Sequence, residues 1–349
     1  MAWGNRAIQD PEAEFPEFRR TFMNRRHIIA ATAAAILAGT LPAGAQTYPT
    51  RPITMIIPFA AGGPTDVVAR IVAEAMSKNL GQSVVIENVA GAGGTTGSTR
   101  LTQQQPDGYS IMIGHTGTHA ASVALYPNLR YNPVSDFAPI GLVNTNAILI
   151  TAKKALPANN LTEFVAWLKA NESTANNAHA GIGSVSHTTC LLLHAIVGVK
   201  PQSVPYRGTG PAMNDLVAGQ VDYLCDQVVN VAPQVRAGTI KAFAVAQQQR
   251  NAALPDVPTT AEAGLPAYQV VVWNAMLAPK GTPEPIVARL NQALTAALND
   301  EGVKARLTEL GADLPTGNLA TPAGLRAFLE AEIAKWTPVI KAAGVTAGN

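Results

Sequence analysis

The chain has 349 residues, of which 47% are hydrophobic and 14% charged, and its formal net charge at pH 7 is +2. This small charge, with no long basic run interleaved with aromatic residues, argues against a nucleic-acid-binding protein. The hydrophobic content excludes a disordered chain, and two cysteines exclude both a disulfide-dense scaffold and a four-cysteine zinc site.

Residues 1–45 have the pattern of an export signal. Two arginines at positions 25 and 26 precede an apolar, uncharged run over residues 28–41, and an A-G-A motif ends at Ala45. An earlier arginine pair, at positions 19 and 20, begins a twin-arginine-like pattern, so the Sec and the twin-arginine routes both stay open. We expect cleavage after Ala45 and a mature chain in the periplasm.

Short apolar runs alternate with glycine-rich turns and amphipathic stretches along the mature chain. Strands are predicted over residues 53–57, 83–87, 109–113, 178–183, 203–206, 221–225 and 240–245. Helices are predicted over residues 65–80, 98–105, 161–171, 186–197, 211–218, 231–237, 283–299 and 322–342, with residues 301–310 between the last two. This alternation predicts an α/β protein with parallel strands.

Two longer apolar segments, at residues 139–152 and 270–277, are typical of strands that cross between lobes. The chain then leaves one lobe and returns to it. We expect residues 46–147 plus 272–349 to form lobe 1 and residues 148–271 to form lobe 2, with a cleft between them.

Three strand–turn–helix units, at residues 61–66, 183–187 and 206–211, place backbone amides and a helix N-terminus at a sheet edge. Such an edge suits an anion. No P-loop is present and residues 91–97 miss the dinucleotide fingerprint, so we expect no nucleotide and no cofactor. A carboxylate fits better, because Thr65, Thr116, Ser184 and Ser186 supply neutral hydroxyl groups beside these turns.

The histidines and one aspartate allow two interpretations each. His115 and His119 have zinc-like spacing but no evident third ligand, so we predict no metal site; His115 faces the cleft and His119 caps or packs. His187 is a ligand contact or a capping residue, and Asp226 ends a strand toward the cleft or caps the next helix.

Two further groups of residues each allow two interpretations. Ser184, His187 and Asp226 have the residue types of a hydrolase triad, but the G-x-S-x-G elbow is absent. Cys190 and Cys225 form a disulfide, as the export signal would permit, or remain two buried thiols.

Eight motifs in order resemble one known family. They read Y-P-T-R-P-I (48–53), P-F-A-A-G-G-P-T-D (58–66), E-N with G-A-G-G (87–94), P-D-G-Y (106–109), Y-R-G (206–208), G-Q-V-D (219–222), L-P-D-V-P-T (254–259) and A-P-K-G-T-P (278–283). Together they look like the Bug-type receptors of tripartite tricarboxylate transporters, over residues 47–345. One departure is Ala275, which stands where we would expect the glycine of W-x-G-x-x-x-P.

The resemblance implies a type II periplasmic-binding fold: two α/β lobes, two crossing strands, and an interlobe cleft that holds a small carboxylic acid. It implies a monomeric receptor rather than an enzyme. Its partners would be the membrane permease subunits of such a transporter, or a sensor kinase instead. The residues that match the family's site are Phe59, Gly63, Thr65 and Asp66 in the first lobe, Gly183, Ser184, Ser186 and His187 in the second, and, less specifically, Tyr206, Arg207 and Asp226. Arg207 pairs a second carboxylate or braces its lobe.

Overall fold

The computed structural model describes residues 1, 48–342, 344 and 346–347. The predicted export signal and its cleavage site lie outside the described residues, apart from Met1. Among the helices that are described, none combines the length and the apolarity needed to span a membrane. The described residues from Tyr48 onward form one compact unit.

One half of this unit is built on parallel strands. Strands β2, β1 and β3 lie side by side in parallel, and β9 continues the sheet in the antiparallel direction, followed by β4. Their bounds are β1 (Ile53–Ile57), β2 (Val84–Asn88), β3 (Ser110–His115), β4 (Phe137–Lys153) and β9 (Val271–Pro279). We call this half the first lobe.

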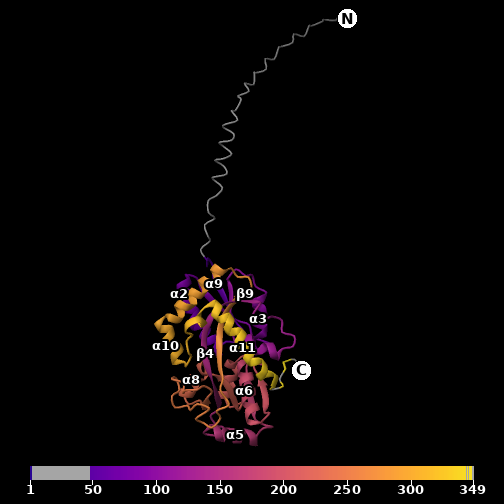
Figure 1. Cartoon of the computed structure of the whole chain (residues 1–349), viewed down its shortest axis with the longest axis vertical. Coiled ribbons are helices and arrows are strands. Elements are labelled where there is room, and N and C mark those ends of the chain that lie inside the picture. The colour runs from indigo at the N-terminus through magenta and orange to yellow at the C-terminus, as the bar shows by residue number, and fades with distance from the viewer. Residues whose placement is uncertain (2–47, 343, 345, 348–349) are drawn as a thin grey trace. The chain divides into compact units, whose positions relative to one another are not determined.

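The other half shares β4. Residues 137–147 of β4 pair with β9, whereas residues 148–153 pair with β7 and β8, so this long strand runs from one lobe into the other (Figure 1). The strands of the second lobe are β5 (Asn176–His179), β6 (Gln202–Pro205), β7 (Tyr223–Gln227) and β8 (Ile240–Val245). The expected α/β fold with two lobes is confirmed.

Helices cover the sheet in both lobes (Figure 1). The first lobe carries α2 (Pro64–Leu80), α3 (Thr95–Thr102), α4 (Ser122–Leu125), α9 (Glu284–Asn299), α10 (Glu301–Glu309) and α11 (Pro322–Ala342), with single turns η1 (Ala92–Gly94), η2 (Gly117–Ala121) and η3 (Gly317–Ala320). The second carries α5 (Leu161–Ala170), α6 (Val185–Val197), α7 (Thr209–Val217) and α8 (Val228–Arg236). Because both faces of β1 are covered, Ile53 and Ile56 on opposite faces are both buried.

Three predicted details are wrong. α2 begins at Pro64, one residue before its predicted start at residue 65, with Gly63 as its N-cap. Strand β7 starts two residues later than predicted, which places Asp226 inside the strand rather than after it. The cap of α6 is the Ser184 hydroxyl, which accepts a hydrogen bond from the His187 amide, so His187 itself is not the cap.

The structure joins Cys190, in α6, to Cys225, in β7, through a disulfide, one of the two alternatives that the sequence left open. Both side chains are fully buried. The bond ties the helix to the strand beneath it, and the two residues are 35 positions apart.

We expect the double substitution Cys190→Ala and Cys225→Ala to lower the free energy of unfolding by about 2–4 kcal/mol, because a cross-link over a loop of this length restricts the unfolded chain. Denaturant unfolding followed by circular dichroism measures this. The native chain unfolded in reductant is the control and should lose a similar amount. Equal stability of the oxidised chain and the variant would contradict the expectation.

Candidate functional site

A small cavity of about 20 Å³ lies between the two lobes, with room for about one water molecule. Seven of its lining residues were predicted from the sequence as ligand-binding, and six others join them. The predicted seven are Phe59, Gly63, Thr65, Asp66, Ser184, Ser186 and Asp226, and the other six are Pro64, His115, Ala180, Val185, Thr209 and Gln227.

Three helices begin at this cavity. Their first residues, Pro64 of α2, Val185 of α6 and Thr209 of α7, all line it. The first amides of a helix have no partner within the helix, and the helix dipole places about half a positive charge at this end. None of the lining residues is a lysine or an arginine. Positive potential in the cavity therefore comes from backbone amides of both lobes.

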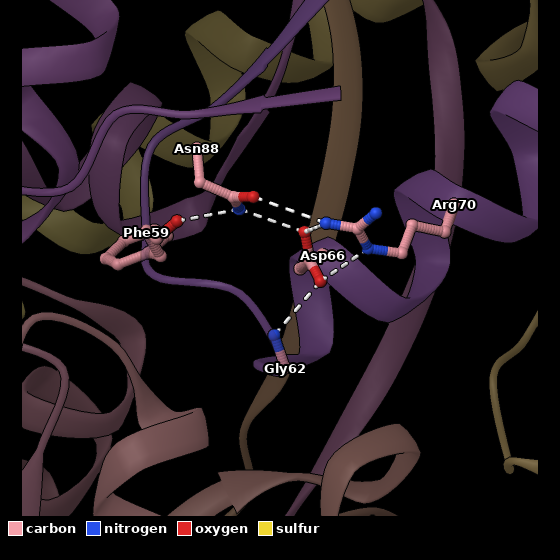
Figure 2. A network of polar contacts seen from close by, with 5 residues as sticks. All are labelled: Phe59, Gly62, Asp66, Arg70 and Asn88. Carbon is pink, nitrogen blue, oxygen red and sulfur yellow. Dashed lines mark hydrogen bonds and ion pairs between the residues drawn. The ribbon is translucent and has the colours of Figure 1, made fainter. Parts of the chain in front are cut away.

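The first-lobe turn is held in place by the carboxylate of Asp66 (Figure 2). Asp66 accepts hydrogen bonds from the Gly62 amide at 3.0 Å, from Asn88 Nδ2 at 2.9 Å and from two guanidinium nitrogens of Arg70 at 2.9 and 3.0 Å. Asn88 Nδ2 also donates to the Phe59 carbonyl, 3.0 Å away. Strand β2 and helix α2 thus fix both sides of the turn that presents Gly63 to the cavity.

The charge of Asp66 is stabilised by these partners. Burial alone would raise the pKa of Asp66, but the hydrogen bonds from Arg70, the Gly62 amide and Asn88, together with the charge of Arg70, lower it below its usual value. Asp66 is therefore ionised at neutral pH, and its charge is neutralised by Arg70 within the same lobe.

Asp66→Asn should reduce the free energy of unfolding by about 2 kcal/mol at neutral pH, because it removes a charge-assisted acceptor from several donors. A carboxyl group whose pKa is lower in the folded than in the unfolded state stabilises the fold at pH values above its pKa in the unfolded chain, which is about 4. This stabilisation disappears as the pH falls through the pKa of the folded state. The difference between the native chain and the variant should therefore shrink below about pH 4. Urea unfolding at a series of pH values checks this, and a difference that stays constant at acidic pH would refute it.

The second-lobe turn is organised by side chains that bond its own backbone. Ser186 Oγ accepts from the Ala180 amide at 3.0 Å, and His187 Nδ1 accepts from the Gly183 amide at 3.2 Å. Ser184 Oγ lies 3.3 Å from Ser186 Oγ and 3.3 Å from the His187 backbone nitrogen. The imidazole of His187 is therefore engaged with the turn and not with a serine hydroxyl, so the arrangement of a nucleophile and its base is not formed here.

His115 lines the cavity from the end of β3, as the sequence predicted. Its ring stacks on Phe59 with centroids 4.8 Å apart, and its Nδ1 accepts from the Gly117 amide at 2.8 Å. Burial lowers the pKa of His115 to about 4, so the ring is neutral at physiological pH. His119 instead packs in the core against Phe137, with ring centroids 4.7 Å apart. Across the described residues, histidine, cysteine and acidic side chains form no group of three or more suited to a metal ion.

Five residues predicted as ligand-binding do not line the cavity. Thr116 Oγ1 accepts from the Trp273 amide at 3.0 Å, and Gly183 packs closely on the ring of Tyr126. Tyr206 donates its hydroxyl to Asp215 at 2.6 Å, and the side chain of Arg207 is exposed. His187, the fifth, accepts a hydrogen bond from the Gly183 amide through its ring nitrogen Nδ1. The third turn reaches the cavity through Thr209 instead.

The two lobes form hydrogen bonds with each other around the cavity, one between backbone atoms and one from a side chain. The Ala60 amide of the first lobe donates to the Arg207 carbonyl of the second at 3.1 Å. The Tyr126 hydroxyl lies 2.8 Å from the Ala92 carbonyl and 2.5 Å from the Ile182 carbonyl of the opposite lobe. The structure is therefore a closed form.

Gly210→Ala should weaken binding of any cavity ligand at least about tenfold, because a closed state that is disfavoured lowers the apparent affinity. A Cβ at this position would lie 2.6 Å from the Ala61 carbonyl oxygen and 2.9 Å from the Gly62 carbonyl carbon, both in the facing lobe. Calorimetric titration measures the affinity. Gly302→Ala, in α10 and away from the cavity, is the matched control, and equal affinity of all three proteins would contradict this reading of the contact.

A chain of buried neutral side chains joins the cavity to the crossing strands. Thr65 Oγ1 donates to Asn274 Oδ1 at 3.3 Å, and Asn274 Nδ2 donates to Asn144 Oδ1 at 3.0 Å. Asn146 Nδ2 donates to Gln227 Oε1 at 2.7 Å. Asn274 Nδ2 also lies 3.5 Å from Gln227 Oε1, which connects the two pairs. This amide chain spans β9, β4 and the end of β7.

Two α/β lobes that share a crossing strand and close over one cavity define the class of periplasmic binding proteins. Within this class, the model of the tripartite tricarboxylate transporter family receptor matches residues 68–345, and the chain belongs to that family. The Bug-type resemblance read from the motifs is confirmed.

Three solved structures are similar over nearly their whole length. MatC (Rpa3494) from Rhodopseudomonas palustris with bound malate is 47% identical, with a TM-score of 0.82 and coverage of 84% of this chain and 100% of that one. The periplasmic binding protein BugD is 44% identical, with a TM-score of 0.83 and coverage of 86% and 99%. Rpa4515 of R. palustris with adipate is 33% identical, with a TM-score of 0.81 and the same coverage.

Proposed function

We propose that this chain is a periplasmic receptor that captures a small carboxylic acid between its lobes without making or breaking a bond. The observation that carries the proposal is the convergence of three helix N-termini, from both lobes, on one small cavity between them. The related proteins MatC and Rpa4515 hold malate and adipate. A cavity lined by amides and hydroxyl groups suits acids of this kind.

Closure supplies the mechanism. The amides of α2 lie on the first lobe and those of α6 and α7 on the second, so an anion meets all of them only when the lobes are together. A ligand that binds the closed state better shifts the population toward it. We assign residues 46–147 plus 272–349 to one moving lobe and residues 148–271 to the other, because residues 137–147 and 148–153 of β4 pair with different strands.

The closed form is the state that a membrane partner would recognise. We propose that this partner is the permease of a tripartite tricarboxylate transporter, in line with the family, and that the receptor acts as a monomer in the periplasm. The same closed form would serve a sensor kinase.

A panel of malate, succinate, adipate, aspartate, nicotinate and benzoate tests the proposal. At least one acid should raise the melting temperature of the ligand-free protein, because a ligand that binds only the folded state stabilises it by mass action. Differential scanning fluorimetry reads the shift, and matched neutral amides of the acids are the control. No shift with any acid, or equal shifts with the amides, would reject carboxylate capture.

A further inference from the structure

The cavity combines an anion-binding geometry with a second, unneutralised carboxyl group. Asp226 lines it from strand β7 and is only 1% exposed. Asp66, the other acidic lining residue, is paired with Arg70, whereas the partners of Asp226 are uncharged. They are Asn230 Nδ2, 2.5 Å from Oδ2, the Thr209 hydroxyl and the Gln227 amide. An anionic ligand would therefore share a buried space with a carboxyl group that has no cationic partner.

The elements packed against β7 supply no free cation to Asp226. They are β4, β5, α6, α7 and α8. Two cations lie on them: Lys153 pairs with Asp222 at 2.6 Å, and Arg236 donates to the Glu309 carbonyl at 2.9 Å. The other titratable groups on these elements are His179, His187, His194 and Asp215.

The histidines around Asp226 stay neutral. Burial lowers the pKa of His179 and His194 to about 4 and that of His187 to about 3. Across the cavity, His115 is neutral for the same reason, with its pKa lowered to about 4. Asp215 accepts from the Tyr206 hydroxyl and does not line the cavity.

We propose that Asp226 sets the charge balance of the occupied cavity: it takes up a proton when a carboxylate binds, and its O–H then donates to the ligand. This inference rests on the proposed capture of a carboxylic acid. Two like charges in one buried site disfavour each other's ionised form, whereas a protonated carboxyl group offers a carboxylate a short, charge-assisted hydrogen bond.

The direction of the resulting pH dependence follows from linkage. Burial already raises the pKa of Asp226 to about 6 in the free protein, so the group is mostly ionised at pH 7. A bound anion raises that pKa further. The affinity for the ligand is therefore highest at pH values below the pKa of Asp226 in the free protein. It falls as the pH rises toward the pKa of Asp226 in the complex.

The test is calorimetric titration with malate, and with every other acid of the panel that binds, in buffers of different ionisation enthalpy. At about pH 7 we expect an uptake of about 0.5 to 1 proton per ligand, and between about pH 6.5 and 8 a loss of affinity of up to about tenfold per pH unit. The ligand carboxyl groups have pKa values below this range and stay ionised in it.

Asp226→Asn keeps an oxygen acceptor for Asn230 and removes the titration. The variant should bind without proton uptake, with affinity independent of pH, and at about pH 8 it should bind more tightly than the native chain. Asp313→Asn is the matched control, because burial also raises the pKa of Asp313 but this residue does not line the cavity. Its proton uptake should equal that of the native chain.

Each remaining outcome has one meaning. The native chain could bind without proton uptake while Asp226→Asn binds more weakly at every pH. This outcome would show that Asp226 stays ionised and accepts a hydrogen bond from a hydroxyl or ammonium group of the ligand. It would overturn the inference and leave carboxylate capture intact. Uptake that disappears in Asp313→Asn would overturn it as well. Failure of every acid to bind would reject the inference together with the proposed function.

Discussion

Backbone amides have to provide the attraction for an anion in this protein, because the cavity is lined by no lysine or arginine. Amides act only where the backbone places them, so the turns must be rigid. Asp66 meets this demand in the first lobe by bonding the Gly62 amide, Asn88 and Arg70 together, and the Ser184 and Ser186 hydroxyl groups meet it in the second. The negative charge of Asp66 is compatible with a nearby anion because the guanidinium group of Arg70 neutralises it.

The same reliance on backbone explains the glycines at the interface between the lobes. Gly208 and Gly210 approach the facing lobe closely: a Cβ on Gly210 would lie 2.6 Å from the Ala61 carbonyl oxygen, and one on Gly208 would lie 3.0 Å from the Ala60 amide nitrogen. Larger residues at these positions would hold the lobes apart. The hydrogen bond from the Ala60 amide to the Arg207 carbonyl needs this close approach. Small residues at these positions are therefore a condition for closing the cavity, in addition to any freedom they give to the turns.

The sequence predicted the fold well, because the apolar runs of β1 and β4 and the glycine-rich turns are local signals. The direction in which a side chain points has no such local signal in the sequence. The third turn was correctly located, but Thr209 rather than Tyr206 or Arg207 faces the cavity, since that depends on how α7 packs against the other lobe. Ala180 and Val185 were missed because small apolar residues have no signal that separates a ligand wall from a core. Asp226 was found, although the strand that carries it was placed two residues too early.

The amide chain along the crossing strands contains one unsatisfied oxygen. Asn146 is fully buried, and its Oδ1 has no hydrogen-bond partner within the described part of the chain, while its Nδ2 bonds Gln227 beside the cavity. A buried acceptor without a donor costs about 1–3 kcal/mol. This cost belongs to the closed arrangement of β4, β7 and β9, and a donor that reached the Asn146 oxygen would remove it.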